Sequence, residues 1–201
     1  MRKPNGYDEA SATIEYKTIR PGGHRCLVHK VEEMKTQSGS EYIKITFDTT
    51  FDDIDPEFYM KKWRSDTRTD KKWGGVMTIF ITDKDGFTTT QFKGFCTSLE
   101  QSNPGYKIKW DDSTTASMAK KLIGLVFREE EFEKQDGTVG VAVKAAWACD
   151  IHKTAEQDIP KRRVLKTNNA PSAPSYVPNT PAPENYAPNF TPVEGDDDLP
   201  F

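Results

Sequence analysis

The residues of this chain whose types and spacing best suit chemistry lie in the stretch 56–75, PEFYMKKWRSDTRTDKKWGG. From 61 to 72 six basic residues stand against two acidic ones, and aromatic residues interleave with them. Basic side chains neutralise phosphates and release counterions, and aromatic faces stack on unpaired bases, which contributes about 1–3 kcal/mol per base. The stretch therefore predicts a surface for single-stranded nucleic acid. Its candidate residues are Lys61, Lys62, Trp63, Arg64, Arg68, Lys71, Lys72 and Trp73.

Trp73 has a second interpretation, because it stands next to a strand-like segment. A tryptophan in that position is equally suited to capping the apolar interior of the body. Trp63 is flanked by Lys62 and Arg64, and this context favours contact with a ligand.

Five further candidates come from the polar faces of strand-like segments. In EYIKITF (41–47) and YKIKW (106–110), and again in the last strand-like segment, polar and apolar residues alternate with the period of a β-strand. Each of these polar positions also suits an ordinary site on a half-buried strand. The five candidates are Tyr42, Lys44, Lys107, Lys109 and Lys144.

The residues that enzymes use most often show no catalytic arrangement. The three histidines lack an adjacent serine or aspartate pattern for a triad, and the sequence contains neither a Walker A motif nor GxGxxG. His24-x-Cys26 and Cys149-x-x-His152 offer four zinc ligands in principle, but Cys149 and His152 would point to opposite faces of a continuing strand. We therefore expect a protein that is not an enzyme, with no cofactor and no metal.

The elements that must position the candidates are mostly β-strands. Apolar residues at i, i+3, i+4 and i+7 predict one helix over 92–99, and a second short helix is expected over 113–121 with an N-cap at Ser113 or Thr114. Five strands with a helix before the last hairpin favour a mainly β protein with a five-stranded OB-fold barrel, although the strand count also suits an SH3-like or another small barrel. The basic stretch is an insertion between the second and third strands. The predicted strands are 24–31, 41–47, 75–83, 122–133 and 139–151.

Three cysteines and one tryptophan are expected in the interior. Cys26, Cys96 and Cys149 each lie in an apolar context, so they are predicted to be reduced and mostly buried thiols. Simple alternation puts Trp147 on the same strand face as Val143, which favours a place in the core.

The composition changes at about Lys166. All 28 Lys and Arg residues lie at or before this position, and eight of the 13 prolines lie after it. The segment that follows has no hydrophobic period and cannot bury enough apolar surface to offset its ordering entropy. We predict a nucleic-acid-binding domain over 1–166, a disordered Pro/Asn/Ala-rich linker over 167–194, and an acidic tip, GDDDLPF, over 195–201.

No stretch approaches the run of about 18 apolar residues that crosses a bilayer. The first 20 residues contain no apolar run of the kind that a secretory signal requires. A cytoplasmic protein without a membrane partner is therefore expected.

GDDDLPF resembles the C-terminal tip of bacterial and phage single-stranded DNA-binding proteins, a run of aspartates followed by an aliphatic residue, Pro and Phe. The resemblance implies that the tip recruits replication, recombination and repair proteins: the aromatic end enters an apolar pocket, the terminal carboxylate meets a basic side chain, and the aspartates meet a basic rim. The implied partner-binding residues are Asp196, Asp197, Asp198, Leu199, Pro200 and Phe201.

The body departs from the bacterial housekeeping pattern, since no strand of the type NRVVLVGRL is present. FKGFCTSLEQSNPG and LIGLVFREEEFEKQDGTVG look more like divergent proteins of phages or mobile elements of Gram-positive hosts. The family's tetrameric state and its base-stacking positions are therefore not carried over. The oligomeric state stays open, homo-oligomers included.

Two other functions remain compatible with the sequence. One is a replisome adaptor whose β domain binds protein while the tip recruits a further component. The other is a metal-dependent nuclease or an annealing protein that uses the cluster Asp52, Asp53 and Asp55. RNA in place of DNA is also open, because stacking and phosphate contacts do not separate the two.

Overall fold

The structure is a computed structural model that describes residues 18–165. The chain divides into two units, 1–166 and 167–201, and all described residues belong to the first. The predicted linker and the tip residues Asp196 to Phe201 lie outside the described residues.

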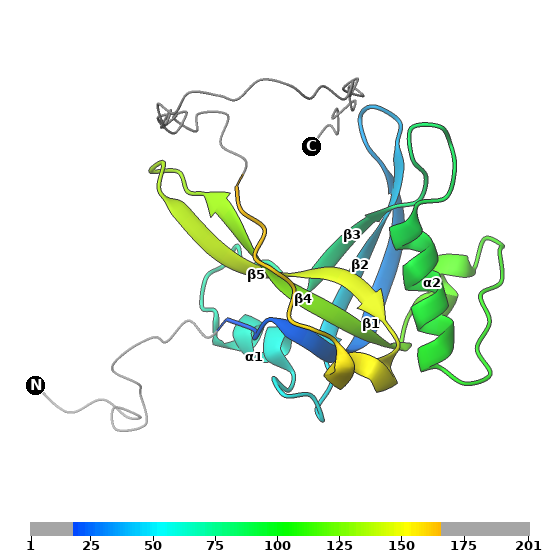
Figure 1. Cartoon of the computed structure of the whole chain (residues 1–201), viewed down its shortest axis with the longest axis horizontal. Coiled ribbons are helices and arrows are strands. Elements are labelled where there is room, and N and C mark those ends of the chain that lie inside the picture. Colours follow the sequence, from blue (N-terminus) through cyan, green and yellow to red (C-terminus); the bar gives the residue numbers. More distant parts are fainter. Residues whose placement is uncertain (1–17, 166–201) are drawn as a thin grey trace, which may run out of the picture. The chain divides into compact units, whose positions relative to one another are not determined.

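The described unit is mainly β, as predicted, and its five strands form one antiparallel sheet in the order β3-β2-β1-β4-β5 (Figure 1). Central strand β1 pairs with β2 on one side and with β4 on the other. The β4–β5 hairpin continues past the end of the β1–β4 ladder and extends away from α2 (Figure 1). The strands are β1 (Gly22–Lys35), β2 (Glu41–Thr49), β3 (Val76–Phe80), β4 (Leu122–Glu133) and β5 (Val139–Cys149).

The sheet is not closed into a barrel, which corrects the five-stranded barrel expected from the sequence. β3 and β5 are its two ends and do not pair with each other. β3 has only five residues, and helix α2 (Thr90–Ser102) contacts both β3 and β5. Gln91 of α2 donates a hydrogen bond from Nε2 to the Ala146 carbonyl of β5 at 3.1 Å. A helix thus contacts both end strands and bonds to β5, whereas closure of the barrel would need β3 and β5 to pair with each other.

The helices agree only partly with the sequence. α2 and the short α3 (Thr114–Met118) are present where they were predicted. Thr89 caps α2, because its hydroxyl accepts the backbone N–H of Phe92. Helix α1 (Phe58–Ser65) was not predicted, and a 3-10 turn, η1 (Ile151–Glu156), begins at the last residue of the predicted fifth strand.

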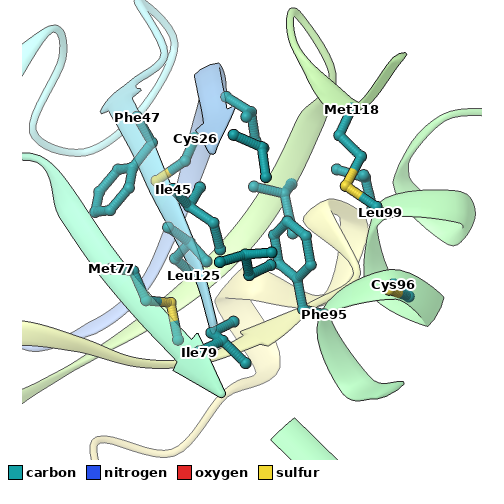
Figure 2. Close-up of a cluster of buried hydrophobic side chains, with 14 of the residues drawn as sticks. Cys26, Ile45, Phe47, Met77, Ile79, Phe95, Cys96, Leu99, Met118 and Leu125 are labelled. Atoms are coloured by element: carbon teal, nitrogen blue, oxygen red, sulfur yellow. The ribbon is translucent and has the colours of Figure 1, made fainter. Parts of the chain in front are cut away.

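α2 packs on one face of the sheet and forms the core with it. Phe95 and Leu99 of the helix are fully buried and point toward the sheet residues Ile45 and Leu125 (Figure 2). The i, i+3, i+4 spacing of the helix and the alternation of the strands put these apolar side chains on facing surfaces. We call this the core face of the sheet and the opposite one the outer face.

A β-bulge in β5 overturns the predicted core position of Trp147. The register shifts by one residue, because Val126 pairs with Trp147 whereas Phe127 pairs with Ala145. A one-residue shift moves every later side chain to the other face. Trp147 therefore lies on the face opposite Ala145 and is 38% exposed.

The three cysteines are free thiols, two of them buried and Cys149 half-buried. Burial raises the pKa of Cys96 and of Cys149 to about 11, and the pKa of Cys26 is also raised by burial.

At pH 8 a thiol with a pKa of about 11, such as that of Cys96 or Cys149, is thiolate in only about one molecule in a thousand. In the folded protein we expect an aromatic disulfide reagent to react with these thiols at least about 100-fold more slowly than in guanidinium chloride, where all three react. One rapidly reacting thiol in the folded state would contradict this expectation.

Among residues 18–165, no helix is both long and apolar enough to cross a membrane.

Candidate nucleic-acid interface

The basic stretch is built around helix α1, which the end of β2 holds in place. Buried Asp48 accepts backbone hydrogen bonds from Tyr59 and Met60 at the helix N-terminus, each at 2.9 Å. The hydroxyl of Thr49 accepts a third, from Phe58. These side chains satisfy N–H groups that have no partner within the helix, and the charge of Asp48 faces the positive end of the helix dipole. A strand thus supplies the cap, and α1 is fixed to the sheet.

Replacing Asp48 by alanine should release α1. The change removes the acceptor of three backbone N–H groups, those of Thr49, Tyr59 and Met60, and should lower the free energy of unfolding by about 2–4 kcal/mol. Asp48→Asn keeps one acceptor oxygen, so its free energy of unfolding should lie between those of the wild type and Asp48→Ala. Urea unfolding measures both changes, and a loss below about 0.5 kcal/mol for alanine would show that the cap does not hold the helix.

Trp63 projects from α1 with a cation on one of its faces. The ammonium of Lys71 lies 3.8 Å from the centroid of the indole ring and also donates to the carbonyls of Trp63 and Asp66. Arg68 pairs with Asp66 and lowers the pKa of that carboxyl to about 2. The indole remains 40% exposed. A large aromatic surface therefore stands beside fixed positive charge, which is the arrangement that stacks a base and holds its phosphate.

Five cations of this stretch make no ion pair with any residue of the described part of the chain: Lys61, Lys62, Arg64, Lys71 and Lys72. Lys61 donates to the Pro56 carbonyl, and Lys62 lies over the ring of Phe58. Lys62, Arg64 and Lys72 are exposed. Unpaired exposed cations are the groups that an incoming polyanion neutralises, at little cost in lost contacts.

Trp73 is held by the body, as its second interpretation allowed. Its indole Nε1 donates to the Phe47 carbonyl at 3.0 Å, and its ring meets the ring of His29 edge-on, with centroids 5.7 Å apart. Its side chain is half-buried against the core. The main role of Trp73 is therefore structural, and it joins the basic stretch to β1 and β2.

The outer face of β1, β2 and β3 carries a row of large side chains. Tyr42 pairs with Met34 of β1 and with Phe80 of β3, so the three residues lie side by side on one face. The rings of Tyr42 and Phe80 are 5.9 Å apart, and Phe80 is 45% exposed. Lys44 stands in the next row, opposite Thr78. Tyr42 and Lys44 thus belong to one exposed aromatic and basic surface, which we call the outer-face patch.

Sequence reasoning missed Phe80 and Met34. The signal was present in GVMTIFITD, where Val76, Thr78 and Phe80 alternate with the buried Met77 and Ile79. The outer-face patch and α1 lie toward opposite ends of β2, since Tyr42 is the second residue of the strand and Asp48, near its end, holds the helix. The six residue steps between them span about 20 Å.

Lys107 and Lys109 do not belong to this surface. The segment 106–110 is not a strand, and Glu100 of α2 holds it through Lys107 Nζ at 2.8 Å and the backbone N–H of Ile108. Because Tyr106 and Ile108 pack against the core, this segment lies on the core side of the sheet, opposite the face that carries Lys44. Figure 1 shows α2 on that side.

Lys144 is also separate. It lies in the β4–β5 hairpin beside Glu130, at 3.6 Å. Burial would raise the pKa of Glu130, but Arg128, Lys144 and Arg163 together lower it. Lys144 therefore belongs to a local charge network in the hairpin.

The acidic residues before α1 are used in structural contacts. The buried side chain of Asp53 accepts from His24 Nδ1 at 2.8 Å and from the Arg25 backbone N–H at 2.7 Å. Asp55 pairs with Arg20, whose contacts lower the pKa of that carboxyl against the effect of burial, and Asp52 pairs with Arg25. Within residues 18–165, no three His, Cys, Asp or Glu side chains are grouped as a metal site would need.

No protein-family model matches the chain, and the search of curated proteins finds no match either.

Proposed function

We propose that this protein binds single-stranded DNA, without strong sequence preference, along a surface that joins the basic stretch at α1 to the outer-face patch. The observation that carries the proposal is the fixed helix α1, where exposed Trp63 stands among cations that have no carboxylate partner within residues 18–165. Duplex DNA hides its base faces, so exposed aromatic rings beside cations favour single strands. The protein is proposed to protect single strands in replication and recombination, as a binding protein and not as an enzyme.

The strand order supports an OB fold with an open seam. An OB fold is a five-stranded, partly open barrel that binds oligonucleotides on the face of its strands 2 and 3. The outer-face patch lies on β2 and β3, with Met34 of β1 beside it. The proposed surface therefore coincides with the face that this fold commonly uses.

The tip GDDDLPF is proposed to recruit replication, recombination or repair proteins. This second part rests on the sequence resemblance and on the chemistry of Asp196 to Phe201, an aromatic anchor next to three carboxylates. Phe201→Ala should abolish partner binding and leave oligonucleotide affinity within about twofold.

Fluorescence anisotropy of a labelled 30-nucleotide oligo-dT tests the binding proposal. We expect affinity for the single strand to exceed that for a duplex of equal length by at least about 100-fold. Affinity should also fall steeply from 50 to 200 mM salt, because several phosphates are neutralised. No binding to oligo-dT at 50 mM salt would overturn the proposal and favour the adaptor function. Equal affinity for oligo-U and oligo-dT would extend the proposal to RNA.

A further inference from the structure

The described unit protects the free edges of its sheet unequally. β4 pairs with β1 only as far as Phe127, so its edge is open beyond that point. Arg163 covers this opening as a parallel bridge: Glu131 N–H donates to the Arg163 carbonyl, and Arg163 N–H donates to the Glu129 carbonyl. Arg162 adds ion pairs to Glu129 and Glu131.

Beyond the bond of Gln91 to Ala146, the edge of β5 from Val139 to Ala145 has no such cover among residues 18–165. β5 ends the sheet, and no strand of the described part pairs with its far side. From Val139 to Ala145 it carries a single charge, Lys144, and no proline. Val139 is 54% exposed and Val141 is 43% exposed. A long, apolar and uncovered edge is a template for pairing with another chain.

The hydrogen-bond pattern shows which β5 groups point outward. The backbone N–H of Lys134 bonds to the Thr138 carbonyl at the hairpin turn. Bonded and non-bonded pairs alternate from there in the antiparallel ladder, so Val139, Val141 and Val143 direct their N–H and C=O groups away from β4. The N–H of Glu131, which pairs with Val141, points away from β5 to Arg163, as this alternation requires.

We propose that the β5 edge binds the β5 edge of a second copy of this chain, antiparallel and centred on Ala142. In this register Val141 of each copy faces Val143 of the other, and Val139 faces Ala145. These are the outward-pointing residues, so each facing pair makes two hydrogen bonds, about eight in total. The two sheets become one continuous sheet across a two-fold axis.

The side chains suit this register. Val139, Val141 and Val143 lie on one face, and in the dimer they make an apolar cluster with their counterparts. Lys144 comes opposite Gly140 of the second copy, where a Cβ atom would approach the ring of Phe132 to 2.6 Å and the Lys134 side chain to 3.0 Å. Lys144 therefore meets an aromatic ring, which favours the pairing, and the like charge of Lys134, which weakens it; the valine cluster on the other face carries the pairing.

The test is the mass of the full chain in solution, by sedimentation equilibrium from 1 to 200 μM. A strand-edge interface is smaller than a standard protein interface, so we expect a dissociation constant in the micromolar range. The wild type should approach twice the 22.8 kDa of one chain at the upper end. A monomer at every concentration would overturn the proposal.

Two variants locate the interface. Val141→Pro removes an outward N–H and leaves the bonds to β4 in place, so the hairpin should persist while the dimer is lost. Val141→Lys puts a charge in the valine cluster and should weaken the dimer at least about 30-fold. Val164→Lys, a matched change at an exposed valine next to the β4 edge, should leave it unchanged. A dimer that survives both Val141 changes would show that β5 is not the interface.

The dimer is independent of nucleic-acid binding. Its test contains no oligonucleotide, and the Val141 variants change no residue of the outer-face patch or of α1. Failure of either proposal therefore leaves the other standing.

Discussion

Replacing Asp53 by alanine is expected to lower the free energy of unfolding by about 3–5 kcal/mol, one of the largest effects of a single change in this protein. The Asp53 carboxylate is 2% exposed and meets His24, whose side chain is fully buried. It also accepts the backbone N–H groups of Arg25 and Asp55. Removing the carboxylate leaves the His24 ring nitrogen and the N–H groups of Arg25 and Asp55 without this partner. Each buried polar group without a partner costs about 1–3 kcal/mol, which together gives the loss stated above.

Urea unfolding monitored by circular dichroism measures the Asp53 effect. Asp52→Ala is the matched control, because Asp52 is 42% exposed and pairs with Arg25 at the surface. A surface ion pair contributes about 0–1 kcal/mol. If the two variants lose the same stability, the buried pair does not organise the loop between β2 and α1.

Reversing three cations of the basic stretch should reduce affinity for oligo-dT at least about 100-fold at 100 mM salt. The triple variant Lys62→Glu, Arg64→Glu, Lys72→Glu changes exposed side chains that have no ion-pair partner among residues 18–165, so the fold should keep its stability. Each lost phosphate contact also lowers the slope of log affinity against log salt by about 1.

A second triple variant controls for the change in net charge. Lys93→Glu, Lys109→Glu, Lys153→Glu alters the charge by the same amount at exposed positions outside the proposed surface. We expect its affinity to stay within about threefold of wild type. Equal losses in the two variants would mean that general attraction, and not the α1 surface, governs binding.

The sequence predicted the strands and α2 because their apolar periods are regular. Ile43, Ile45 and Phe47 alternate with polar residues, and all three are buried as that alternation requires. The same pattern put Tyr42 and Lys44 on the outer face. Pattern reasoning works here because the period of a strand fixes which side chains face the core.

α1 could not be predicted from its own residues. FYMKKWRS has no apolar stripe long enough to indicate a helix, and the residues that cap it, Asp48 and Thr49, belong to the preceding strand. The bulge at Ala146 could not be predicted for a related reason. It changes only how β5 pairs with β4, and the residues of β5 themselves give no sign of it. Both features depend on contacts between elements.

Some basic candidates are free to bind a phosphate and others are paired with a carboxylate, and the sequence alone does not show which. Lys107 and Lys144 have basic side chains like those of α1, yet Glu100 and Glu130 neutralise them. Whether a lysine has a carboxylate beside it depends on the fold. The open barrel also depends on the fold, because β3 is short and α2 contacts both end strands.

The most direct test of the proposed DNA-binding surface is a tryptophan-fluorescence titration with oligo-dT for the wild type and for Trp63→Phe. We expect the wild type to be strongly quenched and Trp63→Phe, which keeps a stacking ring, to lose most of the quenching. Trp63→Ala removes the ring and should lose about 5- to 150-fold in affinity, as the loss of one base stack implies. Trp110→Phe is the control, because Trp110 is 69% exposed and lies against Phe92 of α2. It should keep the quenching and the affinity of the wild type. Unchanged quenching in Trp63→Phe together with unchanged affinity in Trp63→Ala would contradict the proposal that the α1 surface binds the single strand.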